Sequence, residues 1–121
     1  MTPTLYSVAV FVSDIDRAVV FYRDQLGLTL TRKGSFGAEF CEGDTHLGVH
    51  PAVHLDARSL VGRHTGITFR VPDLLTFCER LHQAGVQFVN PPTRQSFGVM
   101  AMIADPDGNV LALWDDVVPP E

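Results

Sequence analysis

An internal repeat constrains the fold of this 121-residue chain more than any other feature of its sequence. A stretch of alternating apolar residues, closed by an aspartate, occurs near the start of the chain and again 59 positions later. The matched positions are Val8 and Ile67, Val10 and Phe69, Val12 and Val71, and Asp14 and Asp73. Alternation predicts a strand with one buried face, and a segment with helical spacing follows each copy. The chain is therefore predicted to contain one supersecondary unit twice.

The first copy predicts one helix and four strands. Asp14 is expected at the N-cap of the helix, which runs to about Leu26 and ends at Gly27. The strands are predicted at Leu5–Val12, Leu28–Lys33, Phe36–Cys41 and His46–His50.

The second copy follows the segment Ala52–Gly62, which shows neither period and is predicted to be a linker. Its helix carries an apolar stripe and ends at Gly85. The stripe consists of Leu74, Phe77, Cys78 and Leu81. Strands are predicted at Val86–Val89 and Phe97–Ile103, with a loop over Asn90–Ser96 between them.

The last strand is predicted to begin after the turn at residues 105–109. Pro106 fixes one turn dihedral, Asp107 is expected to hydrogen-bond the nearby backbone, and Gly108 supplies a positive φ. In the apolar strand that follows, Val110, Ala112 and Trp114 point to one face.

These elements predict an α+β fold of two βαβββ modules in a single domain over residues 1–121. Module 1 covers about residues 5–51, the linker about 52–62 and module 2 about 63–116. Each helix covers one face of its own sheet, so two modules together form a curved mixed sheet around a cleft, with the helices outside. The linker permits pairing within one chain or a swap between two chains.

Composition excludes several classes of partner. A hydrophobic share of 45%, with 19% charged residues, is typical of a globular protein. The formal charge of −5 and the absence of a basic tract argue against nucleic acid and anionic membrane as partners. No transmembrane run or signal peptide is recognised, and we expect a cytoplasmic protein. Cys41 and Cys78 are expected to be buried, reduced thiols.

The sequence resembles the vicinal oxygen chelate superfamily, which includes glyoxalase I, extradiol dioxygenases, bleomycin-resistance proteins and fosfomycin-resistance enzymes. The resemblance lies in the βαβββ repeat and four short motifs, and it covers nearly the whole chain. The motifs are residues 8–14 with Arg17-Ala18, Phe21-Tyr22, Leu26-Gly27-Leu28, and the turn at 105–109. The resemblance is stronger evidence for the fold than for a particular reaction, since one fold hosts many functions.

In metal-dependent members, His, Glu or Gln ligands come from the first and last strands of each module. Transferred by motif, the four ligand positions are Ser7, Gly48, Gly66 and Ala112, with a slip of two residues allowed at Gly48. A serine, two glycines and an alanine offer neither imidazole nor carboxylate. We therefore predict no metal and no other cofactor. A divalent ion held by His50 with His64 or His46 is the alternative.

Strand parity predicts the ligand-binding residues of the cleft. They are Ser7, Phe11, His50, Thr68, Arg70 and Trp114. His50 and Glu39 are the candidates for catalysis, because imidazole titrates near neutral pH. Each has a plainer alternative: His50 as an inert strand-end residue, Glu39 as a solvated one. Likewise, Trp114 either stacks on a ligand or seals the sheet or a subunit contact, and Arg70 holds an anionic group or pairs with Glu39 or another acidic residue.

The preferred interpretation is a small-molecule-binding protein of the bleomycin-resistance type, with a metal-free apolar cleft and an aromatic or anionic ligand. We expect a homodimer. Whether the chain is an enzyme stays open. As an enzyme it would be a glyoxalase-like lyase or isomerase, or an extradiol-dioxygenase-like oxidoreductase, using a divalent metal on non-standard histidines or a metal-free reaction through His50 and Glu39. A regulatory module without any small ligand is the third alternative.

Overall fold

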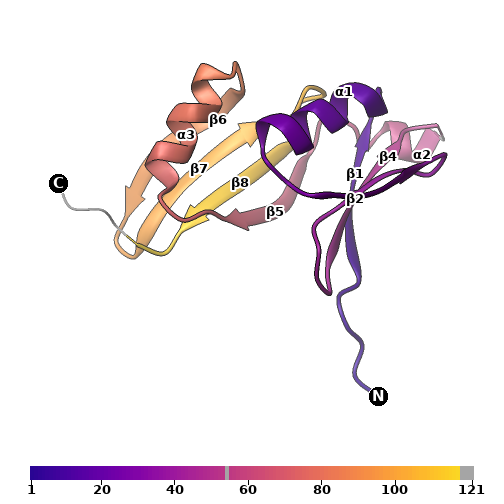
Figure 1. Ribbon diagram of the computed structural model, residues 1–121, viewed down its shortest axis with the longest axis horizontal. Coiled ribbons are helices and arrows are strands. Elements are labelled where there is room, and N and C mark those ends of the chain that lie inside the picture. Colours follow the sequence, from indigo (N-terminus) through magenta and orange to yellow (C-terminus); the bar gives the residue numbers. More distant parts are fainter. Residues whose placement is uncertain (54, 118–121) are drawn as a thin grey trace. The chain divides into compact units, whose positions relative to one another are not determined.

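The structure is a computed structural model that describes residues 1–53 and 55–117 (Figure 1). The chain divides into two compact units, Met1–Gly62 (unit 1) and Arg63–Glu121 (unit 2). His54 of the predicted linker and the last four residues of the predicted domain lie outside the described residues. Each unit contains a mixed four-stranded sheet and follows the βαβββ order, which confirms the predicted α+β class.

Unit 1 is built on a sheet in the order β1-β4-β3-β2. The strands are β1 (Ser7–Val12), β2 (Leu30–Gly34), β3 (Gly37–Phe40) and β4 (His46–Pro51). β1 runs parallel to β4, whereas β4, β3 and β2 are antiparallel neighbours. After β1 the chain crosses over through the helix and comes back beside β1 only in β4, the last strand of the unit. This makes the sheet mixed.

The helix of unit 1 begins and ends where the sequence predicts. It consists of α1 (Ile15–Val19) continued by the π-helical segment η1 (Val20–Gln25). The carboxylate of Asp14 accepts a hydrogen bond from the Arg17 N–H at 3.1 Å, so Asp14 is the N-cap. At the other end Gly27 has a φ of 89°, a conformation that glycine adopts without strain.

The core of unit 1 lies between this helix and one face of the sheet. Val10 and Val12 of β1 have no exposed surface, and neither has Tyr22. The Tyr22 ring lies 5.8 Å from that of Phe40 on β3. Tyr22 is thus a core residue, as its place on the helical stripe indicates.

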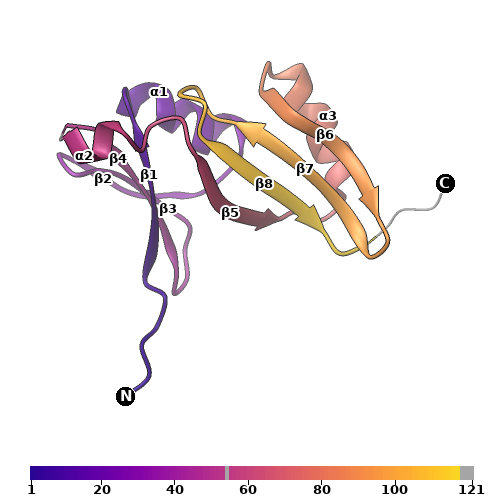
Figure 2. The ribbon, with the colours of Figure 1, turned by 180° about the vertical axis from the view of Figure 1, so that it is seen from behind.

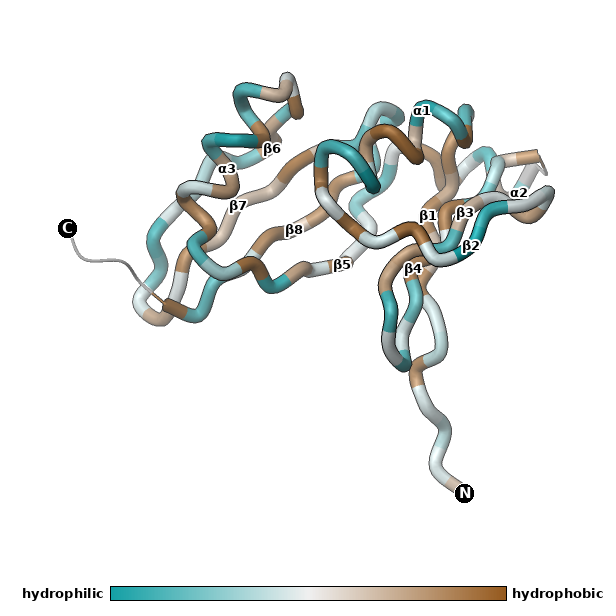
Figure 3. The backbone as a smooth tube through the Cα atoms, in the orientation of Figure 1, coloured by the Kyte–Doolittle hydropathy of each residue, from teal (hydrophilic) through white to brown (hydrophobic). Residues whose placement is uncertain are grey.

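Unit 2 repeats the arrangement with the order β5-β8-β7-β6, which Figure 2 shows from behind. Its elements are β5 (His64–Arg70), α3 (Leu74–Gln83), β6 (Gln87–Gln95), β7 (Gly98–Ala104) and β8 (Val110–Asp115). β5 runs parallel to β8, and the other pairs are antiparallel. Leu74, Cys78 and Leu81 of α3 are buried against the sheet, so most of the predicted stripe is core. Apolar residues run along β7 and β8, while apolar and polar residues alternate along α3 (Figure 3).

The repeat is not exact at the second helix. Asp73 matches Asp14 in sequence, yet its backbone is left-handed, with a φ of 53°. The first turn of α3 is capped instead by Asp115 at the end of β8, whose Oδ2 accepts from the Leu74 N–H at 3.3 Å. Capping from another strand fastens α3 to the sheet.

The turn at residues 105–109 is organised by the side chain of Asp105, to which the sequence analysis assigned no role. The Asp105 side chain, only 4% exposed, accepts from the backbone N–H groups of Asp107 (3.0 Å) and Asn109 (2.9 Å) and from the Asn109 amide (2.9 Å). Gly108 has the expected positive φ, 85°. The Asn109 Oδ1 accepts from the Arg63 N–H at 3.3 Å, which ties the turn to the start of β5.

Two segments differ from the prediction. The prediction of a loop at Asn90–Ser96 is wrong, because β6 continues to Gln95 through Pro91 and Pro92. Register shifts between Phe88, Asn90 and Thr93 accommodate the prolines, and β6 is an edge strand, where a missing N–H is tolerated. The predicted linker contains a short helix, α2 (Leu55–Arg58). Within the described ranges, no helix is long and apolar enough to cross a membrane.

Candidate functional site

In each unit, the candidate site is the sheet face turned away from the helix. In unit 1, Ser7, Ala9 and Phe11 of β1 pair with His46, Gly48 and His50 of β4, and Glu39 of β3 pairs with Gly48. Paired residues of neighbouring strands point to the same side. These seven residues define the unit-1 face, opposite the buried Val10 and Val12.

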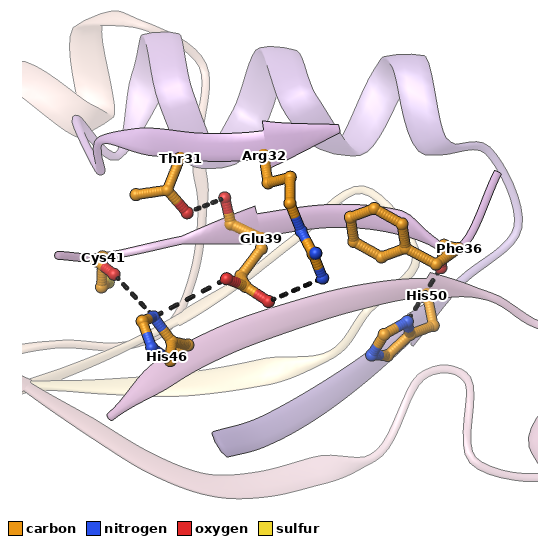
Figure 4. A network of polar contacts seen from close by, with 7 residues as sticks. All are labelled: Thr31, Arg32, Phe36, Glu39, Cys41, His46 and His50. Atoms are coloured by element: carbon orange, nitrogen blue, oxygen red, sulfur yellow. Dashed lines mark hydrogen bonds and ion pairs between the residues drawn. The ribbon is translucent and has the colours of Figure 1, made fainter. Parts of the chain in front are cut away.

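A polar network lies across the unit-1 face (Figure 4). Glu39 lies between Arg32 and His46: Oε2 is 3.6 Å from the Arg32 guanidinium and Oε1 is 3.8 Å from His46 Nδ1. His46 Nδ1 also lies 3.2 Å from the Cys41 carbonyl oxygen. Burial raises the pKa of the Cys41 thiol, which keeps it protonated and poorly nucleophilic. Glu39 is therefore a paired residue, and its contacts run to Arg32 and His46.

His50 has a separate environment on the same face. Its Nδ1 lies 2.9 Å from the carbonyl oxygen of Phe36, at the turn between β2 and β3. The rings of Phe11 and Phe36 flank it at centroid distances of 6.0 Å and 6.5 Å. The two catalytic candidates, His50 and Glu39, thus belong to different sets of contacts.

In unit 2 the corresponding face carries an aromatic and apolar surface. Thr68 and Arg70 of β5 pair with Ala112 and Trp114 of β8, and Met102 and Met100 of β7 pair with the same two residues. We call these six residues the unit-2 face. Thr68 and Arg70 are exposed, while Ala112 is only 7% exposed.

The indole of Trp114 lies over a glycine. A Cβ built on Gly98 would meet the Trp114 ring at 2.5 Å, so only glycine leaves room for the ring at this position. Phe97 lies 5.6 Å from the indole and is 71% exposed. Asp116 accepts from the Trp114 Nε1–H and pairs with Arg70 Nε at 2.9 Å. Arg70 therefore has Asp116 as its acidic partner, and the pair borders the aromatic surface.

Comparison with known proteins identifies the family. The model of the Glyoxalase/Bleomycin resistance protein/Dioxygenase superfamily matches residues 4–113. The chain belongs to this superfamily. A curated relative, glutathione transferase FosA of Serratia marcescens, is 30% identical over 119 residues, covering 93% of this chain and 81% of the relative.

Two solved structures share the fold. UcmS2 matches with a TM-score of 0.82 at 24% identity, covering 94% of this chain and 98% of UcmS2. TnmS3, an antibiotic binding protein from Streptomyces sp. CB03234, matches with a TM-score of 0.73 at 27% identity, covering 96% of this chain and 98% of TnmS3.

The residues at the four positions predicted for the superfamily's metal ligands do not fit a metal. At Gly48, the space for a side chain is filled by the His50 imidazole, whose Nε2 would lie 2.6 Å from a built Cβ. Gly66 has a φ of 76°, at an irregular stretch of the β5–β8 pairing, a conformation that strains any larger side chain. Ser7 and Ala112 lack the imidazole or carboxylate that a divalent ion needs.

Each of the histidines considered as an alternative ligand has a local contact with the backbone. His64 Nδ1 accepts from the Gly66 N–H at 3.2 Å, which places the proton of a neutral imidazole on Nε2. His46 and His50 each turn Nδ1 toward a carbonyl oxygen. Within residues 1–53 and 55–117, the structure contains no group of three or more His, Cys, Asp and Glu residues placed to hold a metal ion.

Sequence reasoning missed three residues that contact these faces: Arg32 at the unit-1 face, and Gly98 and Asp116 at the unit-2 face. Asp116 lies two residues after Trp114, so extending the strand parity by one step past Trp114 would have found it. Gly98 gave no such signal, because the closeness of the indole depends on the β7–β8 pairing. The roles of Ser7, Phe11 and Thr68 in binding a ligand stay predictions.

Proposed function

We propose that the protein binds a planar, largely apolar small molecule, aromatic or anionic, without the help of a metal ion. The observation that carries this proposal is the occupation of the ligand positions: glycines stand at 48 and 66, and the His50 ring takes the space above Gly48. Binding by shape and stacking needs none of the lost ligands. This is the sequestering function of the bleomycin-resistance type.

The unit-2 face supplies suitable contacts for such a molecule. Trp114 and Phe97 offer aromatic surface, and the partly exposed Met100 and Met102 adapt to irregular shapes. Arg70 offers a cation, although an anionic ligand would have to share it with Asp116. The similarity to TnmS3, an antibiotic binding protein, supports the same conclusion.

The test is binding by chelator-treated protein. We would measure thermal shifts with bleomycin and with anthraquinone-2-sulfonate, and follow the fluorescence of Trp114, the one tryptophan of the chain. A ligand at 100 times its Kd adds about 2.7 kcal/mol of stability, which raises the Tm by several degrees. Trp114→Leu is expected to weaken binding, and Val20→Ala, an exposed residue on η1, serves as the control. A stabilisation that appears only after a divalent metal is restored refutes the proposal.

A metal-dependent enzyme is the second candidate, favoured by the similarity to the transferase FosA. It requires His50 as a ligand in place of Gly48. Metal analysis after purification from unsupplemented medium separates the two candidates. Stoichiometric Zn, Ni, Mn or Fe that is lost in His50→Ala would overturn the proposal of metal-free binding and favour the enzyme. The homodimer, the cytoplasmic location and the exclusion of nucleic acid and membrane stay predictions.

A further inference from the structure

We infer that Asp116 is a positioning residue, which holds the indole of Trp114 in the orientation that stacks on a flat aromatic ligand. The inference rests on the proposed function, because it assigns Asp116 a role at the unit-2 face that would bind such a ligand. Asp116 acts through Trp114 and need not touch the ligand itself. The inference requires neither a metal nor a reaction.

One carboxylate connects the aromatic and the cationic side chain of the unit-2 face. Oδ1 of Asp116 accepts from the Trp114 Nε1–H, while Oδ2 pairs with Arg70 Nε at 2.9 Å. Arg70 and Trp114 lie opposite each other in the pairing of β5 with β8. The two oxygens therefore join neighbouring side chains of two strands, and the ion pair with Arg70 restricts the rotation of the carboxylate that holds the indole.

The indole is held at a second place by the backbone of β7. Its Cζ2 and Cη2 atoms would lie 2.5 Å from a Cβ built on Gly98, so this part of the ring rests against the glycine. Such a contact alone permits the ring to slide or turn, whereas a hydrogen bond to Nε1 is directional. The two contacts together define one orientation of the indole.

The oriented ring keeps a surface for a ligand. Trp114 is partly exposed although one side of its indole meets Gly98, so the opposite side is the part that a flat molecule can contact. Phe97, which is 71% exposed, lies 5.6 Å from the indole and tilted by 49°. Stacked and tilted aromatic pairs at such distances attract each other, and a ligand ring would extend the arrangement.

The ion pair with Arg70 is too exposed to be a major source of stability. The side chains of Arg70 and Asp116 are 74% and 55% exposed, and ion pairs in water contribute little to the folded state. Orientation has a larger effect on binding, since a side chain already held in its bound conformation loses less entropy when a ligand arrives. Releasing the indole is therefore expected to weaken binding about threefold to tenfold without unfolding the protein.

The first experiment tests the hydrogen bond without any ligand. Trp114 is the one tryptophan of the sequence, so the proton NMR spectrum of the full-length protein contains a single indole N–H resonance. We expect this proton to exchange with water more slowly in the wild type than in Asp116→Ala. Asp24→Ala, which removes an exposed pair with Arg23 on η1, is the matched control and should leave the exchange unchanged. Equal exchange in the wild type and Asp116→Ala overturns the inference.

The second experiment measures the binding of 2-naphthamide by calorimetry. This probe carries no charge, which separates the orientation of the indole from the charge of Asp116. Asp116→Ala is expected to bind it about threefold to tenfold more weakly than the wild type. Asp116→Asn should stay within about twofold of the wild type, because its amide oxygen still accepts from the Nε1–H. Asp24→Ala should bind as the wild type does.

The outcomes separate this inference from the proposed function. Unchanged binding in Asp116→Ala, or an equal loss in Asp116→Ala and Asp116→Asn, overturns the inference and leaves the proposed function standing. If chelator-treated wild-type protein does not bind 2-naphthamide, that result counts against flat aromatic ligands as a class, and the inference falls with the proposed function.

Discussion

Replacing Gly98 by alanine tests how closely the unit-2 face is packed. A Cβ at this position would lie 2.5 Å from Cζ2 and Cη2 of Trp114 and 2.5 Å from the backbone oxygen of Asp115. Contacts this short force a displacement. The indole is able to move, but the carbonyl belongs to β8, whose pairing with β7 places Val99 opposite Asp115. The variant must therefore rotate Trp114 and distort the end of the β7–β8 ladder.

The magnitude follows from the two groups involved. Overpacking of this kind costs about 1 to 3 kcal/mol. Loss of the Trp114–Phe97 ring contact, now 5.6 Å between centroids, adds about 0.5 to 1.5 kcal/mol. We expect Gly98→Ala to lower the free energy of unfolding by roughly 2 to 4 kcal/mol, and the Tm by roughly 10 °C.

Urea denaturation followed by circular dichroism measures this loss, and the emission of Trp114 reports whether the indole has moved. The double variant with Trp114→Ala provides the control. With the ring removed, only the clash with the Asp115 carbonyl is left, so alanine at 98 should cost less than in the wild type. A Gly98→Ala protein within about 0.5 kcal/mol of the wild type, with unchanged emission, would refute the reasoning.

Three further predictions concern single groups. In Asp105→Asn, an amide replaces a carboxylate that accepts three hydrogen bonds, and the amide NH2 would face a donor. We expect the free energy of unfolding in urea to fall by about 2 to 4 kcal/mol. A fall of less than about 1 kcal/mol would contradict the role described for Asp105. Burial raises the pKa of the Cys78 thiol to about 11 from 9.0. Cys78 of the folded protein should therefore resist iodoacetamide at pH 8, and the protein should lose stability as the pH rises from 9 through 11. Rapid alkylation of Cys78 in the native state would disprove this. Arg70→Gln removes an exposed ion pair with Asp116 and should change the free energy of unfolding by less than about 1 kcal/mol. It should weaken the binding of anthraquinone-2-sulfonate more than the binding of uncharged anthraquinone. An equal effect on both probes would exclude an anion-binding role for Arg70.

Local patterns predicted the fold well where short-range chemistry decides the structure. The alternation of Val8, Val10 and Val12 gave the correct buried face, and Asp14 and Gly27 gave the ends of the first helix. These features depend on neighbouring residues alone. The same parity put His50 on one side with Gly48, and Trp114 on one side with Ala112, in agreement with the strand register.

Prediction failed where a distant part of the chain supplies the partner. Pro91 and Pro92 indicated a loop, but pairing with β7 keeps them in a bulged strand. Asp73 matches the N-cap Asp14 in the repeat, yet Asp115 caps α3 from the far end of the unit. The hydrogen-bond partner of His50 Nδ1 is the Phe36 carbonyl oxygen, fourteen residues away, and sequence spacing alone does not predict this contact.

The irregular edge strand β6 also bears on solubility. An exposed strand edge with a regular row of N–H and C=O groups is a template on which other chains add and aggregate. Pro91 and Pro92 are consecutive residues of β6 without an N–H donor, and the register shifts break the regular spacing of the strand. Replacing both prolines with valine would give β6 a regular edge that pairs with strands of other chains. Under the proposed function, an apolar face left exposed for small molecules makes it useful that the outer strand does not accept further strands.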